Sequence, residues 1–411
     1  MSKRDTQTEY LPRSPGVGED PRDNKDTNTP PGKIWFRDLD EAVIEADRCI
    51  QCGSCAAACP SDSIGIDEID GKPTLVKMCT GCSRCWDFCP RSGLRYERVI
   101  EETEANREGS TSAYAVRSED SAAGEAGQDG GAVTALLAGL LEAGEIDGAV
   151  VAHESEDEPL RGEATLATSR EELLENAGSI FNQTMQLGEI DRVVSESDLD
   201  DPDLALVGTP CVIQGAKALQ SFGRPGERAE IALTVALFCT RSFEYDRLTS
   251  LLVEHGVDPE AVDHLDVTDG KLFAYGEEET LLETDVEAFD AAGLPGCDEC
   301  ADFTGRAADI SAGNVASPDD ATTFVVRGER GASALDAASA ELAVEELGDD
   351  TALRKLAGWN KRKAEESLPR ELDSEGDLNI GYEEHRTNYD GTDREPEPHN
   401  PARAYQYERW C

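Results

Sequence analysis

Two stretches of the chain share one cysteine pattern: Cys49-Ile-Gln-Cys52-Gly-Ser-Cys55-Ala-Ala-Ala-Cys59-Pro60 and Cys79-Thr-Gly-Cys82-Ser-Arg-Cys85-Trp-Asp-Phe-Cys89-Pro90. In each stretch, two residues separate each of the first three cysteines from the next, three residues precede the fourth, and a proline follows it. Thiols at such close and repeated spacing are typical of metal ligands, whereas disulfides are rare in cytosolic proteins. The repeat therefore predicts a small domain that is organised around bound metal.

This spacing is the cysteine run of bacterial two-cluster ferredoxins. Three close thiolates bind one [4Fe–4S] cluster, and the fourth thiolate reaches the other cluster. On this rule the first cluster is held by Cys49, Cys52, Cys55 and Cys89, and the second by Cys79, Cys82, Cys85 and Cys59. Zinc sites also use C-x2-C pairs, but two complete copies that both end in Cys-Pro favour iron–sulfur clusters. The sequence predicts a ferredoxin-like domain that transfers electrons.

The composition indicates which partners the chain avoids. It has 411 residues, 86 Asp and Glu against 38 Lys and Arg, and a formal net charge of −48. Such a field repels nucleic acid and anionic membrane surfaces, so we expect neither as a partner. The acidity runs through the whole chain, and most of it is read as a solvated surface. This pattern resembles that of proteins from salt-in halophilic archaea.

The apolar residues predict no membrane-spanning helix, because no run approaches the roughly 20 residues that a span requires. The first 31 residues contain five prolines and no apolar signal-peptide core. A cytoplasmic location is therefore expected.

Composition shifts divide the chain into five segments. Residues 1–33 are polar and are expected to be a disordered tail. The ferredoxin domain is placed at 34–100, an acidic linker at 101–124, a larger domain at 125–369 and an acidic C-terminal tail at 370–411. Two or three domains agree with the length.

Alternating helix and strand patterns in the larger domain predict an α/β core with a mostly parallel or mixed sheet. Val133, Leu136, Leu137, Leu140 and Leu141 share one helical face, and Gly144 is a candidate helix C-cap. The remaining candidates are strands at 148–152, 204–207, 231–238 and 322–327, and helices near 170–177, 243–255, 334–347 and 351–369.

Four cysteines of the larger domain lie in settings that suit metal ligands. Cys211 follows Gly208-Thr-Pro at the end of a strand candidate, and Cys239 ends the apolar run 233–238. Cys297 and Cys300 form a further C-x2-C pair. The spacing leaves two readings equally open, a third four-cysteine metal site or inert buried thiols. A fifth cysteine, Cys411, is the terminal residue and is expected to have no role.

Six motifs in this region, in order, resemble the coenzyme F420-reducing hydrogenase beta-subunit family. They begin with Gly127-Gln-Asp-Gly-Gly-Ala-Val-Thr-Ala-Leu136. The other five are Ala177-Gly-Ser-Ile-Phe-Asn182, Gly208-Thr-Pro-Cys211, Phe238-Cys239, Cys297-x2-Cys300-x-Asp302-Phe303 and Ala308-Asp-Ile-Ser-Ala-Gly313. The resemblance covers about residues 41–365.

The resemblance implies a mixed α/β fold that binds FAD and one further [4Fe–4S] cluster, whose ligands would be Cys211, Cys239, Cys297 and Cys300. It places Gln128, Asp129, Gly130, Gly131 and Thr134 at the FAD site, with Gly178, Ser179 and Asn182 nearby. The residues themselves agree, because a helix that begins after Gly130-Gly131 offers free N–H groups and a positive dipole end to a diphosphate. The competing reading is a glycine turn that merely enters a helix. No residue is assigned as a catalytic nucleophile.

The resemblance also implies an activity, namely electron exchange between coenzyme F420, which carries hydride, and iron–sulfur clusters through FAD. The redox partner would be a protein or a larger complex. Two alternatives keep the fold. In the first, the protein reduces another substrate, such as a tetrapyrrole, or supplies electrons to a sulfite- or glutamate-type reductase. In the second, it is a non-catalytic electron-transfer subunit. One motif departs from the family, because Gly178-Ser-Ile-Phe181 has Ile180 where members often carry a basic residue.

Overall fold

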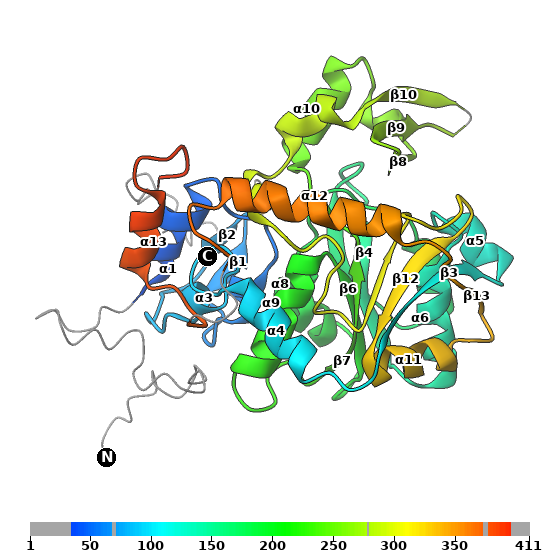
Figure 1. Cartoon of the computed structure of the whole chain (residues 1–411), viewed down its shortest axis with the longest axis horizontal. Coiled ribbons are helices and arrows are strands. Elements are labelled where there is room, and N and C mark those ends of the chain that lie inside the picture. Colours follow the sequence, from blue (N-terminus) through cyan, green and yellow to red (C-terminus); the bar gives the residue numbers. More distant parts are fainter. Residues whose placement is uncertain (1–33, 68–70, 278, 373–376, 396–411) are drawn as a thin grey trace, which may run out of the picture.

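The computed structural model describes residues 34–67, 71–277, 279–372 and 377–395. It has a small cysteine-rich module beside a larger domain built on one eight-stranded sheet (Figure 1). A C-terminal helix packs on the small module (Figure 1). The predicted class, a ferredoxin-type domain followed by a mixed α/β domain, is confirmed.

The small module repeats its backbone as well as its cysteines. Gln51 and Gly53 have positive φ angles of 51° and 77°, and Gly81 and Ser83, at the same places in the second copy, have 66° and 68°. Each copy then forms one short helix. The helices and strands of the module are α1 (Phe36–Leu39), η2 (Asp40–Ile44), α2 (Ser54–Ala57), the antiparallel pair β1 (Ile64–Ile66) and β2 (Pro73–Leu75), and α3 (Arg84–Asp87).

The large sheet has a parallel centre and antiparallel flanks. Its strand order is β13-β3-β12-β11-β7-β6-β4-β5. Strands β4, β6, β7 and β11 are mutually parallel, and β3 runs in their direction because β12 is antiparallel to both β11 and β3. The bounds are β3 (Thr111–Ser118), β4 (Gly148–Glu154), β5 (Gly162–Ala167), β6 (Leu204–Gly208), β7 (Ile231–Leu237), β11 (Ile310–Gly313), β12 (Thr322–Arg327) and β13 (Leu342–Glu346).

Helices cover both faces of this sheet and bury its apolar side chains. One face packs against α5 (Ser121–Ala126), α6 (Ala132–Ala143), α7 (Arg170–Glu175) and α11 (Gly328–Ala337). The other packs against α8 (Gln186–Ser195), α9 (Pro210–Phe222) and α12 (Thr351–Ser367), with α4 (Tyr96–Ala105) lying on α9. The predicted helix with Leu136 and Leu140 on its core face is confirmed as α6, and Gly144 caps it at φ 70°.

A second, three-stranded antiparallel sheet stands apart from the large one (Figure 1). Its strands are β8 (His264–Thr268), β9 (Lys271–Tyr275) and β10 (Thr280–Asp285). Together with α10 (Tyr245–Glu254), η3 (Pro259–Ala261) and η4 (Val286–Ala292), it encloses its own apolar cluster. The last short helix, η5 (Pro295–Glu299), leads back to the large domain.

Residues 101–124, predicted as a linker, instead form the end of α4, all of β3 and part of α5. Strand β3 lies inside the sheet between β12 and β13. The polar and small residues of 111–118 hid this strand, because its burial comes from pairing on both edges and not from apolar side chains.

Two further predictions differ from the structure. The helix expected at 334–347 is α11, which ends at Ala337. Strand β13 follows at the edge of the sheet, with Leu342 buried and Val344 exposed. Part of the predicted C-terminal tail forms α13 (Tyr382–Tyr389), which packs on Trp86 through aromatic contacts. The predicted tail 1–33 lies outside the described residues.

Among the described helices, none combines the length and the apolar character that crossing a membrane requires.

Candidate iron–sulfur and cofactor sites

The second predicted ligand set surrounds one cavity. Its lining includes all four thiols of that set, Cys59, Cys79, Cys82 and Cys85. Backbone N–H groups point at two of these sulfurs: Gly81 N lies 3.3 Å from Cys79 Sγ, and Ser63 N lies 3.3 Å from Cys59 Sγ. Such N–H donors stabilise a thiolate bound to iron. The lining and the donors fit a four-iron cluster.

The first predicted set is buried more deeply. Cys49 interacts electrostatically with Cys89 and Cys52. Cys55 interacts in the same way with all three of these thiols. Burial raises the pKa of Cys49 to about 12 and that of Cys89 to about 11. Thiols with such pKa values are inert at neutral pH unless a metal displaces their protons. Cys89 of the second motif therefore lies near the thiols of the first motif, where the sequence rule predicts the fourth ligand.

Within the described residues, no three His, Cys, Asp or Glu side chains converge as the ligands of a single ion do. A four-iron cluster is larger than one ion and holds its thiolates further apart. The finding therefore concerns single-ion sites and does not bear on the cluster sites.

The four later cysteines gather at one edge of the large sheet. Cys211 lies in the first turn of α9, directly after β6, and Cys239 follows β7. Because β6 and β7 are parallel, both residues lie at the carboxyl edge of the sheet. Electrostatic coupling joins Cys211 to Cys239 and Cys297, and Cys239 to Cys300. Burial raises the pKa of the Cys211 and Cys239 thiols, so a cluster here would likewise have to displace protons.

Polar side chains that the sequence analysis did not single out surround this set. Gln183 is buried, and its amide donates to Ser242 Oγ at 3.0 Å and lies 3.8 Å from Cys211 Sγ. The Thr209 hydroxyl lies 3.1 Å from the same sulfur. Thr209 is inside a quoted motif, but Gln183 and Ser242 carried no spacing signal that marked them as neighbours of the cysteines.

The ferredoxin module packs against the helices beside the third cysteine set. Cys52, Cys211 and Cys297 belong to one buried cluster of side chains. Glycines keep the packing close: a Cβ added at Gly53 would lie 2.6 Å from Gly188 N in α8. A Cβ added at Gly215 in α9 would lie 2.0 Å from Ser54 Oγ. The cysteine sets thus follow one another from the sheet edge to the first set and then the second.

The motif predicted to hold FAD forms the turn between α5 and α6. Gly130 and Gly131 have φ angles of 82° and 63°. A Cβ at these positions would meet backbone oxygens, Asp320 O at 2.5 Å and Ala123 O at 2.0 Å. The chain therefore needs glycine here for its own packing, which agrees with the competing reading of a glycine turn that enters a helix. Thr134 lies partly exposed in the first turn of α6.

Two polar residues of this turn contact the separate small sheet. The Gln128 amide donates to Leu265 O in β8 at 2.8 Å. Asp129 is half-buried, and burial, together with the nearby Asp266 carboxylate, raises its pKa to about 6. The turn occupies the same sheet edge as the third cysteine set, because β3, which precedes it, runs parallel to β6 and β7. In open α/β sheets, ligands bind at this edge.

The other predicted FAD residues divide into two kinds. Gly178 and Ser179 are exposed, and a Cβ at Gly178 would meet open space. The Asn182 amide is buried and hydrogen-bonded: it donates to Leu160 O at 2.5 Å and accepts from Gly162 N at 2.8 Å. Asn182 therefore holds the β4–β5 connection in place. The exposed pair leaves backbone available for a ligand.

The fold and the cysteine sets define a class of protein, an iron–sulfur oxidoreductase in which a ferredoxin module packs on a mixed α/β domain. Three family models match segments of this chain, and all three agree with this class. Residues 42–94 match the 4Fe–4S dicluster domain. Residues 113–190 and 201–350 match the N-terminal and C-terminal parts of the coenzyme F420 hydrogenase/dehydrogenase beta subunit.

Proteins that are similar to this chain over most of its length support the same family. An uncharacterised protein of Methanocaldococcus jannaschii is 30% identical over 330 residues, covering 72% of this chain and 88% of that protein. The coenzyme F420 hydrogenase subunit beta of Methanothermobacter thermautotrophicus is 31% identical, covering 61% of this chain and 92% of that subunit. The chain belongs to the coenzyme F420 hydrogenase/dehydrogenase beta-subunit family.

Two further matches link the chain to named redox systems. It is 33% identical to the coenzyme F420-dependent sulfite reductase of M. jannaschii over 70% of its own length, but it spans only 46% of that protein. A chain of the F420-reducing [NiFe] hydrogenase complex from Methanosarcina barkeri shares the fold, with a TM-score of 0.57 and 28% identity, covering 63% of this chain and 90% of that chain.

Proposed function

We propose that this protein is an iron–sulfur flavoprotein that passes electrons between coenzyme F420, FAD and three [4Fe–4S] clusters, to or from a protein partner. The observation that carries the proposal is the order of the cysteine sets. The third set lies at the carboxyl edge of the sheet, which it shares with the N-terminus of α6, and Cys211 of this set interacts electrostatically with Cys52 of the first set. The first set in turn borders the second through Cys55 and Cys85.

The chain's own residues would bind and orient the flavin. The first N–H groups of a helix have no partner within the helix, and α6 presents them at the sheet edge. They suit a diphosphate, and Thr134 adds a hydroxyl in the same turn. Asp129, with its pKa near 6, would hold or release a proton there close to neutral pH. FAD, when bound, would couple hydride exchange with coenzyme F420 to the one-electron chemistry of the clusters.

The second cysteine set supports a protein partner at the other end of the path. Cys59, Cys79 and Cys82 are partly exposed, and the neighbouring Met78 side chain is 89% exposed. A flexible exposed methionine is common at surfaces that bind other proteins. A partner that docks here would bring its redox centre close to the second cluster.

One observation favours a second candidate, in which the same path supplies electrons to a separate reductase protein. The exposed Gly178–Ser179 turn lacks the basic residue that family members often have, and the sulfite reductase relative is 33% identical. In this candidate the flavin and clusters are unchanged, and a reductase is the electron acceptor.

The test is anaerobic purification in high salt, measurement of iron and flavin, and rapid mixing with reduced coenzyme F420. Bleaching of the flavin and cluster absorbance, with oxidation of the deazaflavin, supports the proposal. If bound FAD stays oxidised while dithionite bleaches it, coenzyme F420 is not the substrate. If no flavin is bound, the chain is an electron-transfer subunit alone. Addition of a sulfite reductase to the reduced protein tests the second candidate.

A further inference from the structure

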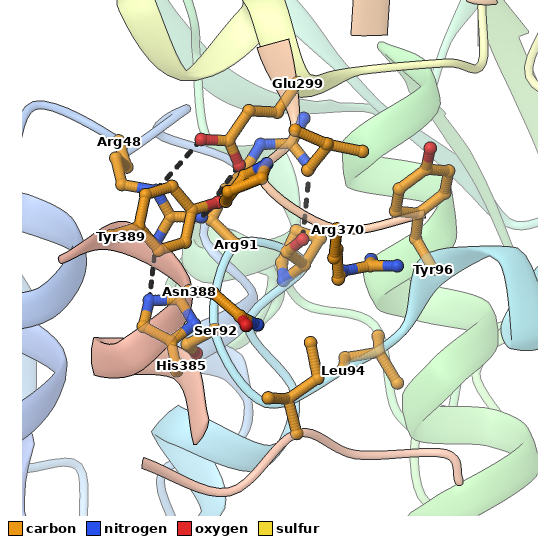
Figure 2. A pocket seen from close by; sticks show the side chains of 14 residues that line it. Arg48, Arg91, Ser92, Leu94, Tyr96, Glu299, Arg370, His385, Asn388 and Tyr389 are labelled. Carbon is orange, nitrogen blue, oxygen red and sulfur yellow. Dashed lines mark hydrogen bonds and ion pairs between the residues drawn. The ribbon is translucent and has the colours of Figure 1, made fainter. Parts of the chain in front are cut away.

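A polar pocket lies between the ferredoxin module, η5 and the C-terminal segment (Figure 2). Three arginines line it, Arg48, Arg91 and Arg370, but only one carboxylate, Glu299. Glu299 already pairs with Arg48 at 2.7 Å and with Arg394 at 2.8 Å. Burial would raise the pKa of Glu299, but the arginines around it lower the pKa to about 2. Arg370 pairs with Glu97 at 2.6 Å. Of the three lining arginines, Arg91 is therefore the one for which the described residues supply no carboxylate ion pair.

Arg91 extends from the first predicted cluster site to the third. Its backbone N–H points at Cys89 Sγ, 3.4 Å away, in the first cysteine set. Its side-chain Nε donates to Gly296 O at 2.9 Å, next to Cys297 of the third set. The side chain is buried, with 5% exposed. A single residue thus connects the ligand loops of two clusters.

The positive charge of Arg91 faces these thiols. Within the described ranges, no carboxylate oxygen forms an ion pair with its guanidinium within 4.0 Å, and the nearby Glu299 is neutralised by Arg48. Burial lowers the pKa of Arg91, but the negative charges of Cys300, Glu299 and Cys297 have a larger effect together, so the pKa is raised. Arginine stays protonated in proteins, so the charge is fixed.

Tyr96, the first residue of α4, lies on the opposite side of the pocket (Figure 2). Its side chain is 4% exposed and packs with Ala307 and Ala301, the residue that follows Cys300. Its hydroxyl is buried, and in the described part of the chain no group forms a hydrogen bond with it. A buried hydroxyl without a partner is costly, which indicates that a group bound at Cys300 completes its hydrogen bonding. Burial and Cys300 raise the pKa of Tyr96, so the hydroxyl is a donor.

We propose that Arg91 and Tyr96 are positioning residues for electron exchange between the first and third clusters. Arg91 supplies a fixed positive charge that both clusters share, and the Tyr96 hydroxyl donates to the sulfur of the third. In the step concerned, one electron leaves one cluster and enters the other, no bond is made or broken, and both side chains keep their protons. A positive charge and a donor both favour the reduced, more negative state. This inference rests on the proposed function, because it requires both clusters.

The test is a redox titration of the full chain, poised with dithionite and mediators and followed by electron paramagnetic resonance. Arg91→Gln should lower the midpoint potentials of the first and third clusters, and Arg91→Lys should restore most of the loss. Tyr96→Phe should lower the midpoint potential of the third cluster alone. At a fixed applied potential, we expect Arg91→Gln to reduce the ratio of reduced to oxidised cluster about tenfold, which is about 59 mV for one electron.

Arg98→Gln is the matched control, because it removes an arginine that lies on α4 and pairs with Glu101 at 3.1 Å. Unchanged potentials in both Arg91→Gln and Tyr96→Phe, with full iron content, would overturn the inference and leave the proposed function intact. A wild-type protein with iron for only two clusters would overturn both. If the Arg91→Gln protein loses iron, the midpoint potentials of Tyr96→Phe and Arg91→Lys test the inference instead.

Discussion

Asp302 shows how one buried carboxylate positions the third cysteine set. It is 1% exposed and accepts from the Gln214 amide at 2.8 Å and from Arg306 N at 3.0 Å. Gln214 lies on α9, one turn after Cys211, while Asp302 follows Cys300 by two residues. The contact therefore ties two of the four predicted ligands together, although they are distant in sequence. Such hydrogen-bonded partners orient the ligands of a metal site.

We expect Cys211→Ser to remove the third cluster and leave the other two. The iron content should fall by about one third, because serine is a poor ligand for these clusters and the other sets share no ligand with this one. Iron analysis and electron paramagnetic resonance measure the loss. Cys411→Ser is the matched control, since Cys411 belongs to none of the three sets. If both variants lose the same amount of iron, or neither loses any, the assignment of Cys211 is wrong.

His385 is expected to make the protein acid-sensitive. It is buried beside Arg48, whose Nη1 lies 2.7 Å from Nε2 of the ring. Burial and the Arg48 charge lower the pKa of His385 to about 3. The unfolded chain binds this proton below about pH 6.5 and the folded chain does not until about pH 3, so stability falls as pH decreases across this range, by up to about 1.4 kcal/mol per pH unit.

Denaturant unfolding at pH 7.0, 6.0 and 5.0 tests this expectation. His385→Gln has no group that titrates there, so its stability should fall less steeply with acid than that of the wild type. His264→Gln is the control, because that ring is exposed. Parallel losses in the wild type and His385→Gln would mean that other groups cause the acid sensitivity.

At the residue scale, the cysteines could be predicted because cluster chemistry fixes their spacing. Gln183, Ser242 and Tyr96 could not, because they approach the sites only through the tertiary fold. The glycines of the α5–α6 turn could be predicted as the entry to a helix, but the close backbone packing that requires them could not, because Asp320 approaches only through the tertiary fold.

Among the elements, the contact of α2 with α8 and α9 holds the ferredoxin module on the large domain. We expect Gly215→Ala to destabilise the protein by about 1–3 kcal/mol, because the new methyl group would lie 2.0 Å from Ser54 Oγ and overpacked sites cost this much. Gly358→Ala is the matched control, a helical glycine in α12 whose nearest neighbour is the Arg362 side chain at 3.4 Å. It should stabilise by up to about 1 kcal/mol. Thermal unfolding of the two variants distinguishes the effects.

If Gly215→Ala is as stable as the wild type, the module is not tightly docked at α9. The order of cysteine sets would then be less rigid than the packing indicates. A stabilised Gly358→Ala in the same experiment shows that the assay detects changes of this size.

The helices were predictable where one apolar face is clear, as in α6, and the parallel strands where apolar residues run together, as in β6. Strand β3 was missed because its residues are small and polar, and its place is set by β12 and β13. Helix α13 was missed because its stability comes from aromatic contacts with Trp86, which local composition does not reveal.

For the whole molecule, the net charge of −48 outweighs the individual ion pairs. Most described ion pairs have at least one exposed partner, and such pairs contribute at most about 1 kcal/mol each. Repulsion among the excess carboxylates acts over the whole surface and destabilises the compact state. Salt should therefore stabilise this protein, because it screens the repulsion more than it weakens the pairs.

We expect the thermal midpoint to rise by several degrees as potassium chloride increases from 0.1 to 1 M, a range in which the screening length falls from about 10 to about 3 Å. Differential scanning calorimetry under anaerobic conditions measures it. Potassium sulfate at equal ionic strength separates two causes, because sulfate also strengthens the burial of apolar surface. Equal rises in both salts indicate screening. A midpoint that rises only in sulfate, or falls in chloride, would show that surface repulsion does not limit the stability of this chain.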